Sequence, residues 1–216
     1  MKPLGRGEIK GTWATLLLPI AEDESIDWRR LEAEIDVLLS SRVDGIYSNG
    51  TAGEFYAQTE AEFDRIQQTL AERCEKAGMP FQAGASHPCA QTCLARARRA
   101  AELRPSAIQV ILPDWFPVTP EEAAAFLEKV AEASAPVPLV VYNPPHAKRV
   151  LSPQEWQTLA AAVPALVGVK VGGGDGAWYA AMIATGLSVF VPGHELASGY
   201  ARGAAGSYSN VACLHP

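Results

Sequence analysis

The sequence predicts a (β/α)8 barrel, and three observations carry the prediction. Short β-prone segments alternate with helix-like segments along all 216 residues. We find no linker or second-domain boundary, so residues 1–216 are expected to form a single barrel domain. The first β-prone segment runs into Leu18-Pro19-Ile20, where an open doubly wound sheet usually carries a glycine-rich phosphate turn. The closed barrel is therefore favoured over that sheet.

The helices are recognised by apolar spacing and by the residues at their ends. Thr59 with Glu62 forms a capping-box pattern. Thr119-Pro120 and Ser152-Pro153 each combine an N-cap with a proline in the first turn, and Gly78-Met79-Pro80 is a helix-ending signal. In chain order, these signals place helices at residues 26–40, 59–77, 90–103, from 119, from 152, 177–185 and 195–202.

The β-segments are short runs rich in Val, Ile, Leu and Tyr, separated from the helices by Gly, Pro or Asn. They are expected at residues 12–20, 45–49, 81–85, 107–112, 139–142, 165–170, 188–191 and 206–211. The chain stops at Pro216, directly after the eighth segment, so we expect a barrel truncated after strand eight. Without a closing helix, apolar surface beside strands one and eight should be exposed.

Charge and composition exclude several classes of partner. The net charge is −6 and no block of Lys or Arg occurs, which argues against nucleic acid and anionic membranes. No apolar run is long enough to span a bilayer, and no apolar core of a secretion signal follows Met1, so a cytoplasmic protein is expected. Cys89 and Cys93 near His87 are interpreted as reduced thiols rather than metal ligands, and the basic residues around Arg96 as a solvated helix face.

Lys170 is the strongest functional candidate, because it closes the apolar segment 165–170 and a glycine run follows at once. An amine at the end of a buried parallel strand would lie in an apolar pocket, which lowers its pKa and makes it a nucleophile toward carbonyl groups. A lysine in this position is, taken alone, more often a solvated boundary residue.

Two further β-segments end in residues that complement an amine. Tyr142 can donate and accept a proton, and Thr51 can pass a proton to it. The backbone N–H groups of Gly50 to Gly53 can hold a carboxylate, because glycines let a ligand approach closely. The alternatives are a core tyrosine and a plain turn. The joint occurrence at three strand ends of one chain favours a Schiff-base site for a 2-oxo acid.

These motifs resemble those of the dihydrodipicolinate synthase/N-acetylneuraminate lyase family, class I aldolases and lyases that form a Schiff base with pyruvate. The resemblance rests on Gly50-Thr51-Ala52-Gly53-Glu54-Phe55, Tyr142-Asn143-Pro144-Pro145 and Gly168-Val169-Lys170, with weaker matches around Gly193 and Gly206. It implies that Lys170 is the Schiff-base lysine, Tyr142 the proton-transfer tyrosine and Thr51 its hydroxyl partner. It further implies substrate contacts from Gly50, Thr51, Ala52, Trp115 and Gly193, and no metal or organic cofactor.

The departures from the family pattern concern the second substrate. Ala52 stands where a second hydroxyl residue is common, and Trp115 lies closest to a relay tyrosine of the dihydrodipicolinate synthases. Ala147 aligns with the arginine that those enzymes use for the aldehyde substrate's carboxylate. A 2-oxo (sugar) acid lyase is therefore favoured over 4-hydroxy-tetrahydrodipicolinate synthase proper.

Two rival interpretations remain open at this point. In the first, the chain is a catalytically inactive relative that binds a small molecule. In the second, it is an unrelated barrel with a phosphate site near Gly193, Gly206 and Arg202. By resemblance we expect a homo-oligomer, a dimer or tetramer. Because the family's C-terminal helical region is missing, its contacts would use barrel surfaces.

Overall fold

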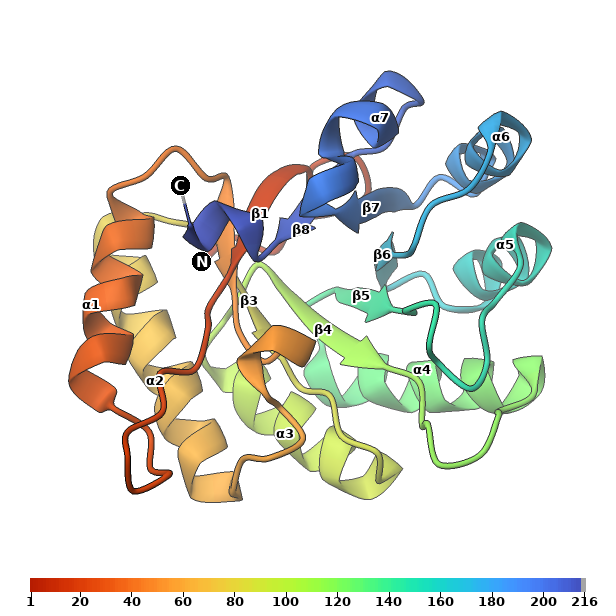
Figure 1. Cartoon of the computed structure of the whole chain (residues 1–216). Helices are drawn as coiled ribbons and strands as arrows, with labels where there is room; N and C mark the ends of the chain where they lie inside the picture. The colour runs from red at the N-terminus through yellow and green to blue at the C-terminus, as the bar shows by residue number, and fades with distance from the viewer. Residues whose placement is uncertain (215–216) are drawn as a thin grey trace.

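Within residues 1–214, which the computed structural model describes, eight parallel strands pair in chain order and close into a barrel (Figure 1). Each strand pairs with the next, and β8 pairs with β1. This confirms the predicted (β/α)8 fold. The strands are β1 (Gly11–Thr15), β2 (Gly45–Tyr47), β3 (Phe81–Gly84), β4 (Ala107–Ile111), β5 (Leu139–Tyr142), β6 (Leu166–Lys170), β7 (Ser188–Pro192) and β8 (Gly206–Ser209).

The helices surround the strands, and after β8 the chain up to residue 214 adds no α-helix, only the short 3₁₀ helix Val211–Cys213 (Figure 1). The three predicted capping boxes, at Thr59, Thr119 and Ser152, are all present. The helices are α1 (Trp28–Leu39), α2 (Glu60–Ala77), α3 (Ala90–Glu102), α4 (Pro120–Ser134), α5 (Pro153–Ala162), α6 (Gly176–Ala184) and α7 (Leu196–Ala201).

Most predicted β-segments extend beyond the observed strands, and the first and the eighth are examples. The first β-segment ends at Thr15 instead of Ile20, because the N–H of Leu17 donates to the Glu34 side chain of α1 and not to a neighbouring strand, and Ile20 forms an antiparallel bridge with Ile26. The eighth ends at Ser209, where a short 3₁₀ turn, Val211–Cys213, follows. Pro216 lies outside the described residues.

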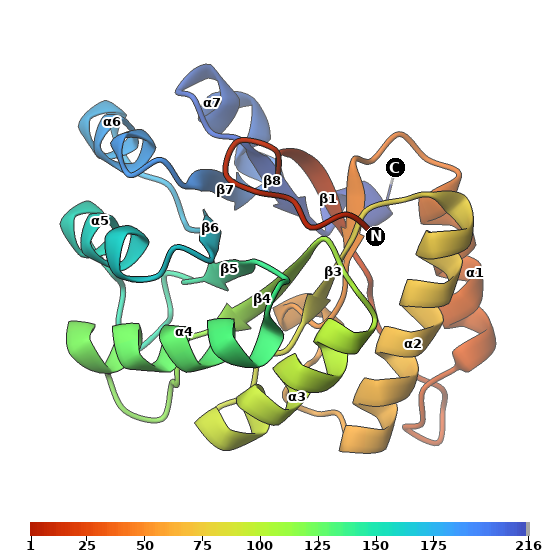
Figure 2. The same ribbon diagram turned by 180° about the vertical axis from the view of Figure 1, so that it is seen from behind.

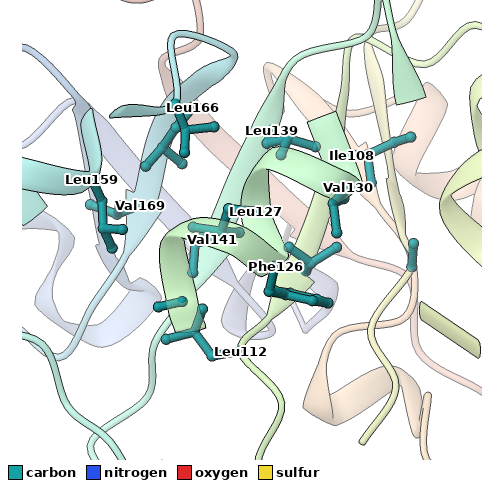
Figure 3. Packing of buried hydrophobic residues seen from close by; sticks show 14 of the residues in the cluster. Ile108, Leu112, Phe126, Leu127, Val130, Leu139, Val141, Leu159, Leu166 and Val169 are labelled. Atoms are coloured by element: carbon teal, nitrogen blue, oxygen red, sulfur yellow. The ribbon is translucent and has the colours of Figure 1, made fainter. Parts of the chain in front are cut away.

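The core has two layers, one outside and one inside the barrel. Outside, alternate strand residues such as Val141 and Val169 pack against Leu127 and Leu159 of the helices (Figure 3). Inside, bulky side chains fill the barrel: Trp13, Tyr47, Ala107, Val140, Val167, Phe190 and Tyr208. The interior is therefore packed, and a ligand can enter only at an end.

The N-terminal segment covers one of the two ends (Figure 2). The backbone N–H of Leu4 donates to the carbonyl of Ser106, just before β4, and the Arg6 guanidinium donates to the carbonyl of Leu166 at the start of β6. Leu4 and Ile9 extend the inner core. The end at which the strands start is thus closed, and the end at which they finish stays accessible.

Apolar surface is exposed beside β1 and β8, as the sequence predicts. A groove of about 540 Å³ runs between these strands and α7. Tyr200 on its rim is 70% exposed. Its lining residues are Gly11, Thr12, Gly193, His194, Leu196, Ala197, Tyr200, Ala205 and Gly206.

The interpretation of Arg96 as part of a solvated face is wrong. Its side chain on α3 is 1% exposed, while Arg98 is exposed and Arg99 lies at the surface with 36% exposure. Arg96 tolerates burial because the carboxylate of Glu60 and backbone carbonyls accept its N–H groups.

Among residues 1–214, no helix has both the length and the apolar character needed to span a membrane.

Closure of the barrel between β8 and β1 depends on the absence of a side chain at residue 206. A Cβ at Gly206 would overlap the backbone of Gly11 on β1. We expect Gly206→Ala to lower the free energy of unfolding by about 2–3 kcal/mol, because the strands must move apart. Gly176→Ala, where a Cβ meets nothing within 4 Å, is the control and should change it by less than about 0.5 kcal/mol. Urea denaturation measures both, and equal stability of the two variants contradicts this account.

Candidate active site

A cavity of about 340 Å³ lies at the carboxyl end of the strands, and Lys170 opens into it. Five of its lining residues are the last residues of β1, β2, β5, β6 and β7: Thr15, Tyr47, Tyr142, Lys170 and Pro192. Parallel strands finish on one face of the barrel, so these residues meet although they lie far apart in the sequence. Tyr208 of β8 also lines the cavity, and the connections after the strands contribute the rest: Thr51, Ala52, Pro145, Val171, Gly172, His194 and Asn210.

The Lys170 amine is surrounded by aromatic rings. Its Nζ lies 4.2 Å from the ring centre of Tyr142, 5.6 Å from that of Tyr47 and 5.7 Å from that of Tyr208. Burial lowers the pKa of Lys170 to about 8, because the surrounding protein replaces the water that would stabilise the ammonium form. About one chain in ten then carries the neutral amine at pH 7, far more than for a solvated lysine.

Tyr142 lies beside this amine and contacts Thr51. Burial raises the pKa of Tyr142, and its hydrogen bond with Thr51 opposes that rise. The phenol therefore stays protonated at neutral pH and can donate a proton. Asn143 fixes the chain directly after Tyr142, since its side chain donates to the carbonyl of Arg149 and accepts from the N–H of Leu151.

Thr51 begins a 3₁₀ turn, Thr51–Gly53, that follows β2. Thr51 and Ala52 both line the cavity. Gly50 lies behind them, where a Cβ would come within 2.7 Å of the Tyr47 ring, so this position must be a glycine for the turn to pack there. The backbone N–H groups of such a turn form a concave anion site.

Two tyrosines of the site were not anticipated from the sequence. The Thr15 hydroxyl donates a hydrogen bond to the Tyr47 hydroxyl at 2.5 Å, and the Tyr208 hydroxyl donates to Gln82 Oε1 at 2.7 Å. Burial raises the pKa of both phenols, so both are neutral. The available signal was strand alternation, which turns Tyr47 and Tyr208 into the barrel with Trp13.

Three of the residues predicted to bind substrate do not line this cavity, and Gly50 is one of them. Trp115 is 76% exposed on the loop after β4, and the Lys148 ammonium lies 5.6 Å from its ring centre. Gly193 lines the outer groove beside β8 and packs against Ser209. The structure thus brings Lys170, Tyr142, Thr51 and Ala52 into one cavity, whereas Gly50, Trp115 and Gly193 do not line it.

A smaller cavity of about 180 Å³ adjoins the first and shares Thr51 and Tyr142 with it. Its walls are largely apolar, with Asp114, His146 and Arg149 as polar groups and Ala147 between them. The Arg149 guanidinium pairs with Glu155. Among residues 1–214, no group of three or more His, Cys, Asp or Glu is placed to hold a metal ion.

The fold class is a (β/α)8 barrel, and a desolvated lysine beside a tyrosine and a threonine at its carboxyl face is an arrangement suited to nucleophilic attack on a carbonyl group. Comparison with known sequences identifies the family of the chain. The profile of the Dihydrodipicolinate synthetase family matches residues 8–206, and the chain belongs to this family. The rival interpretation of an unrelated barrel with a phosphate site is therefore wrong.

The curated relatives carry two kinds of name. A 4-hydroxy-tetrahydrodipicolinate synthase of Thermomicrobium roseum is 31% identical over 161 residues, which cover 73% of this chain and 52% of that protein. An N-acetylneuraminate lyase 2 of Escherichia coli is 25% identical over 169 residues, 78% of this chain and 55% of that protein. The chain spans about half the length of these relatives.

Solved structures agree with the fold. A crystal structure of dihydrodipicolinate synthase superposes with a TM-score of 0.86 at 25% identity, covering 95% of this chain and 71% of that one. A Clostridium difficile protein, CdNal, crystallised with mannosamine, has a TM-score of 0.89 at 18% identity, covering 95% and 72%.

The lowered pKa of Lys170 predicts a measurable pH dependence. The rate of reductive methylation at Lys170, followed by peptide mass spectrometry, should rise with a midpoint near pH 8, with the exposed Lys129 as internal reference. The folded chain holds fewer protons here than the unfolded chain between pH 8 and 10.5, so this group's contribution to stability grows as the pH rises through that window. A midpoint near 10.5 would show a hydrated amine.

Proposed function

We propose that this chain is a lyase or aldolase in which Lys170 forms a Schiff base with pyruvate or another 2-oxo acid. The observation that carries the proposal is the desolvated amine 4.2 Å from the Tyr142 ring, in a cavity that also contains Thr51. Membership of the Dihydrodipicolinate synthetase family supports it. The chemistry that follows uses only side chains and backbone groups of this chain.

The first steps need a nucleophile and a proton donor. The neutral Lys170 amine attacks the ketone carbon, and the oxygen of the resulting carbinolamine takes a proton and leaves as water. Tyr142 supplies that proton, and Thr51, which contacts it, returns one from solvent. The backbone N–H groups of Thr51 and Ala52 receive the substrate carboxylate, because the N–H of Gly53 already donates to the carbonyl of Gly50.

The product of these steps is an iminium cation on Nζ. The faces of Tyr142, Tyr47 and Tyr208 are turned to this charge at distances at which aromatic rings attract cations. The iminium withdraws electrons from the neighbouring carbon, so a C–C bond can break or form there, or water can be lost. The lysine thus supplies the electron sink that other enzymes take from an organic cofactor.

The second substrate is proposed at the level of its class. The names of the relatives include both dihydrodipicolinate synthases and sialic acid lyases. In this chain Ala147 lines the adjoining cavity at the position of the synthases' arginine, and Arg149 is paired with Glu155. We therefore favour cleavage, condensation or dehydration of a 2-oxo (sugar) acid over 4-hydroxy-tetrahydrodipicolinate synthesis.

The proposal also covers the compartment, the partners and the oligomeric state of the chain. The charge pattern is that of a cytoplasmic protein without nucleic-acid or membrane partners. Tyr56 on the wall of the adjoining cavity, and Trp115 and Phe116 on the loop after β4, are more than half exposed, which favours burial against a second copy in a homo-oligomer.

Borohydride trapping tests the Schiff base directly. With pyruvate present, reduction should attach the three-carbon acid covalently to the peptide containing Lys170, because borohydride converts the iminium to a stable amine. Lys170→Met should remove the adduct. An inactive small-molecule-binding relative would give no adduct, and an adduct on another lysine would remove Lys170 from its proposed role.

Tyr142→Phe removes the hydroxyl group and keeps the ring, so it tests the hydroxyl alone. The ring still faces the amine, but the proton donor is gone, so trapping should be about 100-fold slower. Tyr200→Phe, on an exposed ring outside the cavity, is the matched control and should trap at the unchanged rate. Equal rates for Tyr142→Phe and the unaltered chain would show that another group moves the proton.

A further inference from the structure

The turn that carries Thr51 is held by very few bonds of its own. Inside the segment 50–57, the backbone N–H groups of Gly53, Glu54 and Ala57 donate to carbonyls three residues earlier. Such short 3₁₀-type turns are weakly cooperative. The Thr51 side chain is exposed to the cavity, so packing does not fix it either. Gly53 and Phe55 are buried, so contacts with the rest of the chain contribute to the position of the turn.

A buried arginine supplies part of that support. Arg96 Nη1 donates to the carbonyls of Phe55, 3.1 Å away, and Ser86, 2.9 Å away. Nε donates to Glu60 Oε1 at 2.9 Å, and Nη2 lies 2.8 Å from the same oxygen. The guanidinium also covers the ring of Phe63, 4.7 Å from its centre. Arg96 thus joins α3, the start of α2, the loop after β3 and the segment that follows the turn.

Gln58 also supports the turn, and its carbonyl lies within hydrogen-bond distance of the same arginine. Its Nε2 donates to the carbonyl of Gly53, the last residue of the turn, at 2.7 Å, and to Asn49 Oδ1 at 3.0 Å. Arg96 Nη2 lies 3.5 Å from the Gln58 carbonyl. Asn49 precedes the turn and Gly53 ends it, so Gln58 fixes both of its ends. We name Arg96, Gln58 and Glu60 the clamp.

We propose that the clamp, and Arg96 in particular, is a positioning device for the substrate carboxylate: it holds the turn 50–53 so that its N–H groups and Thr51 face the Lys170 cavity. Neither Arg96 nor Gln58 lines that cavity. The role is therefore exerted through the turn and not by contact with substrate. This inference rests on the proposed Schiff-base function.

The choice of arginine at residue 96 follows from this task. A fully buried cation is tolerated only where acceptors surround it. Carbonyls in loops and a carboxylate on a neighbouring helix can meet the planar guanidinium at several N–H groups at once. An ammonium group at residue 96 would meet fewer of them. An apolar residue would fill the space but leave the carbonyls of Phe55 and Ser86 without a donor.

The test measures borohydride trapping as a function of pyruvate concentration in Arg96→Met and Gln58→Met. A displaced turn weakens carboxylate binding, so the pyruvate concentration at half-maximal rate should rise about 10-fold, while the maximal rate should change less than about 3-fold. Arg96→Lys should give an intermediate rise. Hydrogen exchange at residues 50–58 should become faster in the same variants.

Arg99→Met is the matched control. Arg99 lies on the same helix, pairs with the same Glu60 and with Asp64, and makes no recorded hydrogen bond to residues 50–58. It should leave the half-maximal concentration unchanged. Gln58→Met keeps the test decisive if Arg96→Met does not fold, because it removes the bonds to Asn49 and Gly53 without unpairing a buried charge.

Three outcomes are distinguishable. A higher half-maximal concentration in the clamp variants alone supports the proposal. An unchanged concentration in folded Gln58→Met, or an equal rise in Arg99→Met, overturns the clamp and leaves the Schiff-base function intact. Failure of the unaltered chain to trap pyruvate overturns the proposed function, and the clamp's role falls with it.

Discussion

The site depends on the removal of water from one amine. Lys170 is the last residue of a strand whose other residues are buried, and tyrosine rings surround its Nζ instead of carboxylates. A carboxylate partner would stabilise the ammonium form and raise the pKa, whereas apolar and aromatic walls leave desolvation as the dominant effect. The aromatic faces still attract a cation, so the same walls that free the amine suit an iminium formed on it.

Closure of the barrel makes this environment from short strands. Register pairs Tyr142 with Lys170 and Lys170 with Phe190, so the side chains at the strand ends converge on one opening. The interior below is filled by Trp13, Tyr47, Tyr208 and their neighbours, and the N-terminal segment covers the opposite end. Water can therefore reach the amine only through the cavity that substrate would occupy.

Alternation of β-prone and helical segments was enough to predict the barrel, and strand-end chemistry was enough to predict Lys170, Tyr142 and Thr51 together. Each lies beside a local signal in the chain, a glycine run or a proline. Tyr47, Tyr208 and the clamp have no such signal, because their roles depend on which strands become neighbours. Arg96 is the clearest example of what the sequence could not predict. The basic residues of its helix indicate a solvated face, yet carbonyls from distant loops accept its N–H groups and make burial possible. The exposed position of Trp115 could not be predicted either, since matching a motif does not fix where a loop side chain points.

A crystal structure of the chain soaked in pyruvate tests the central claim most directly. The account predicts continuous density from Lys170 Nζ to the ketone carbon, with the carboxylate against the N–H groups of Thr51 and Ala52 and the Tyr142 hydroxyl beside the new bond. Pyruvate bound without a covalent link, or a Lys170 side chain turned out to solvent, would contradict it.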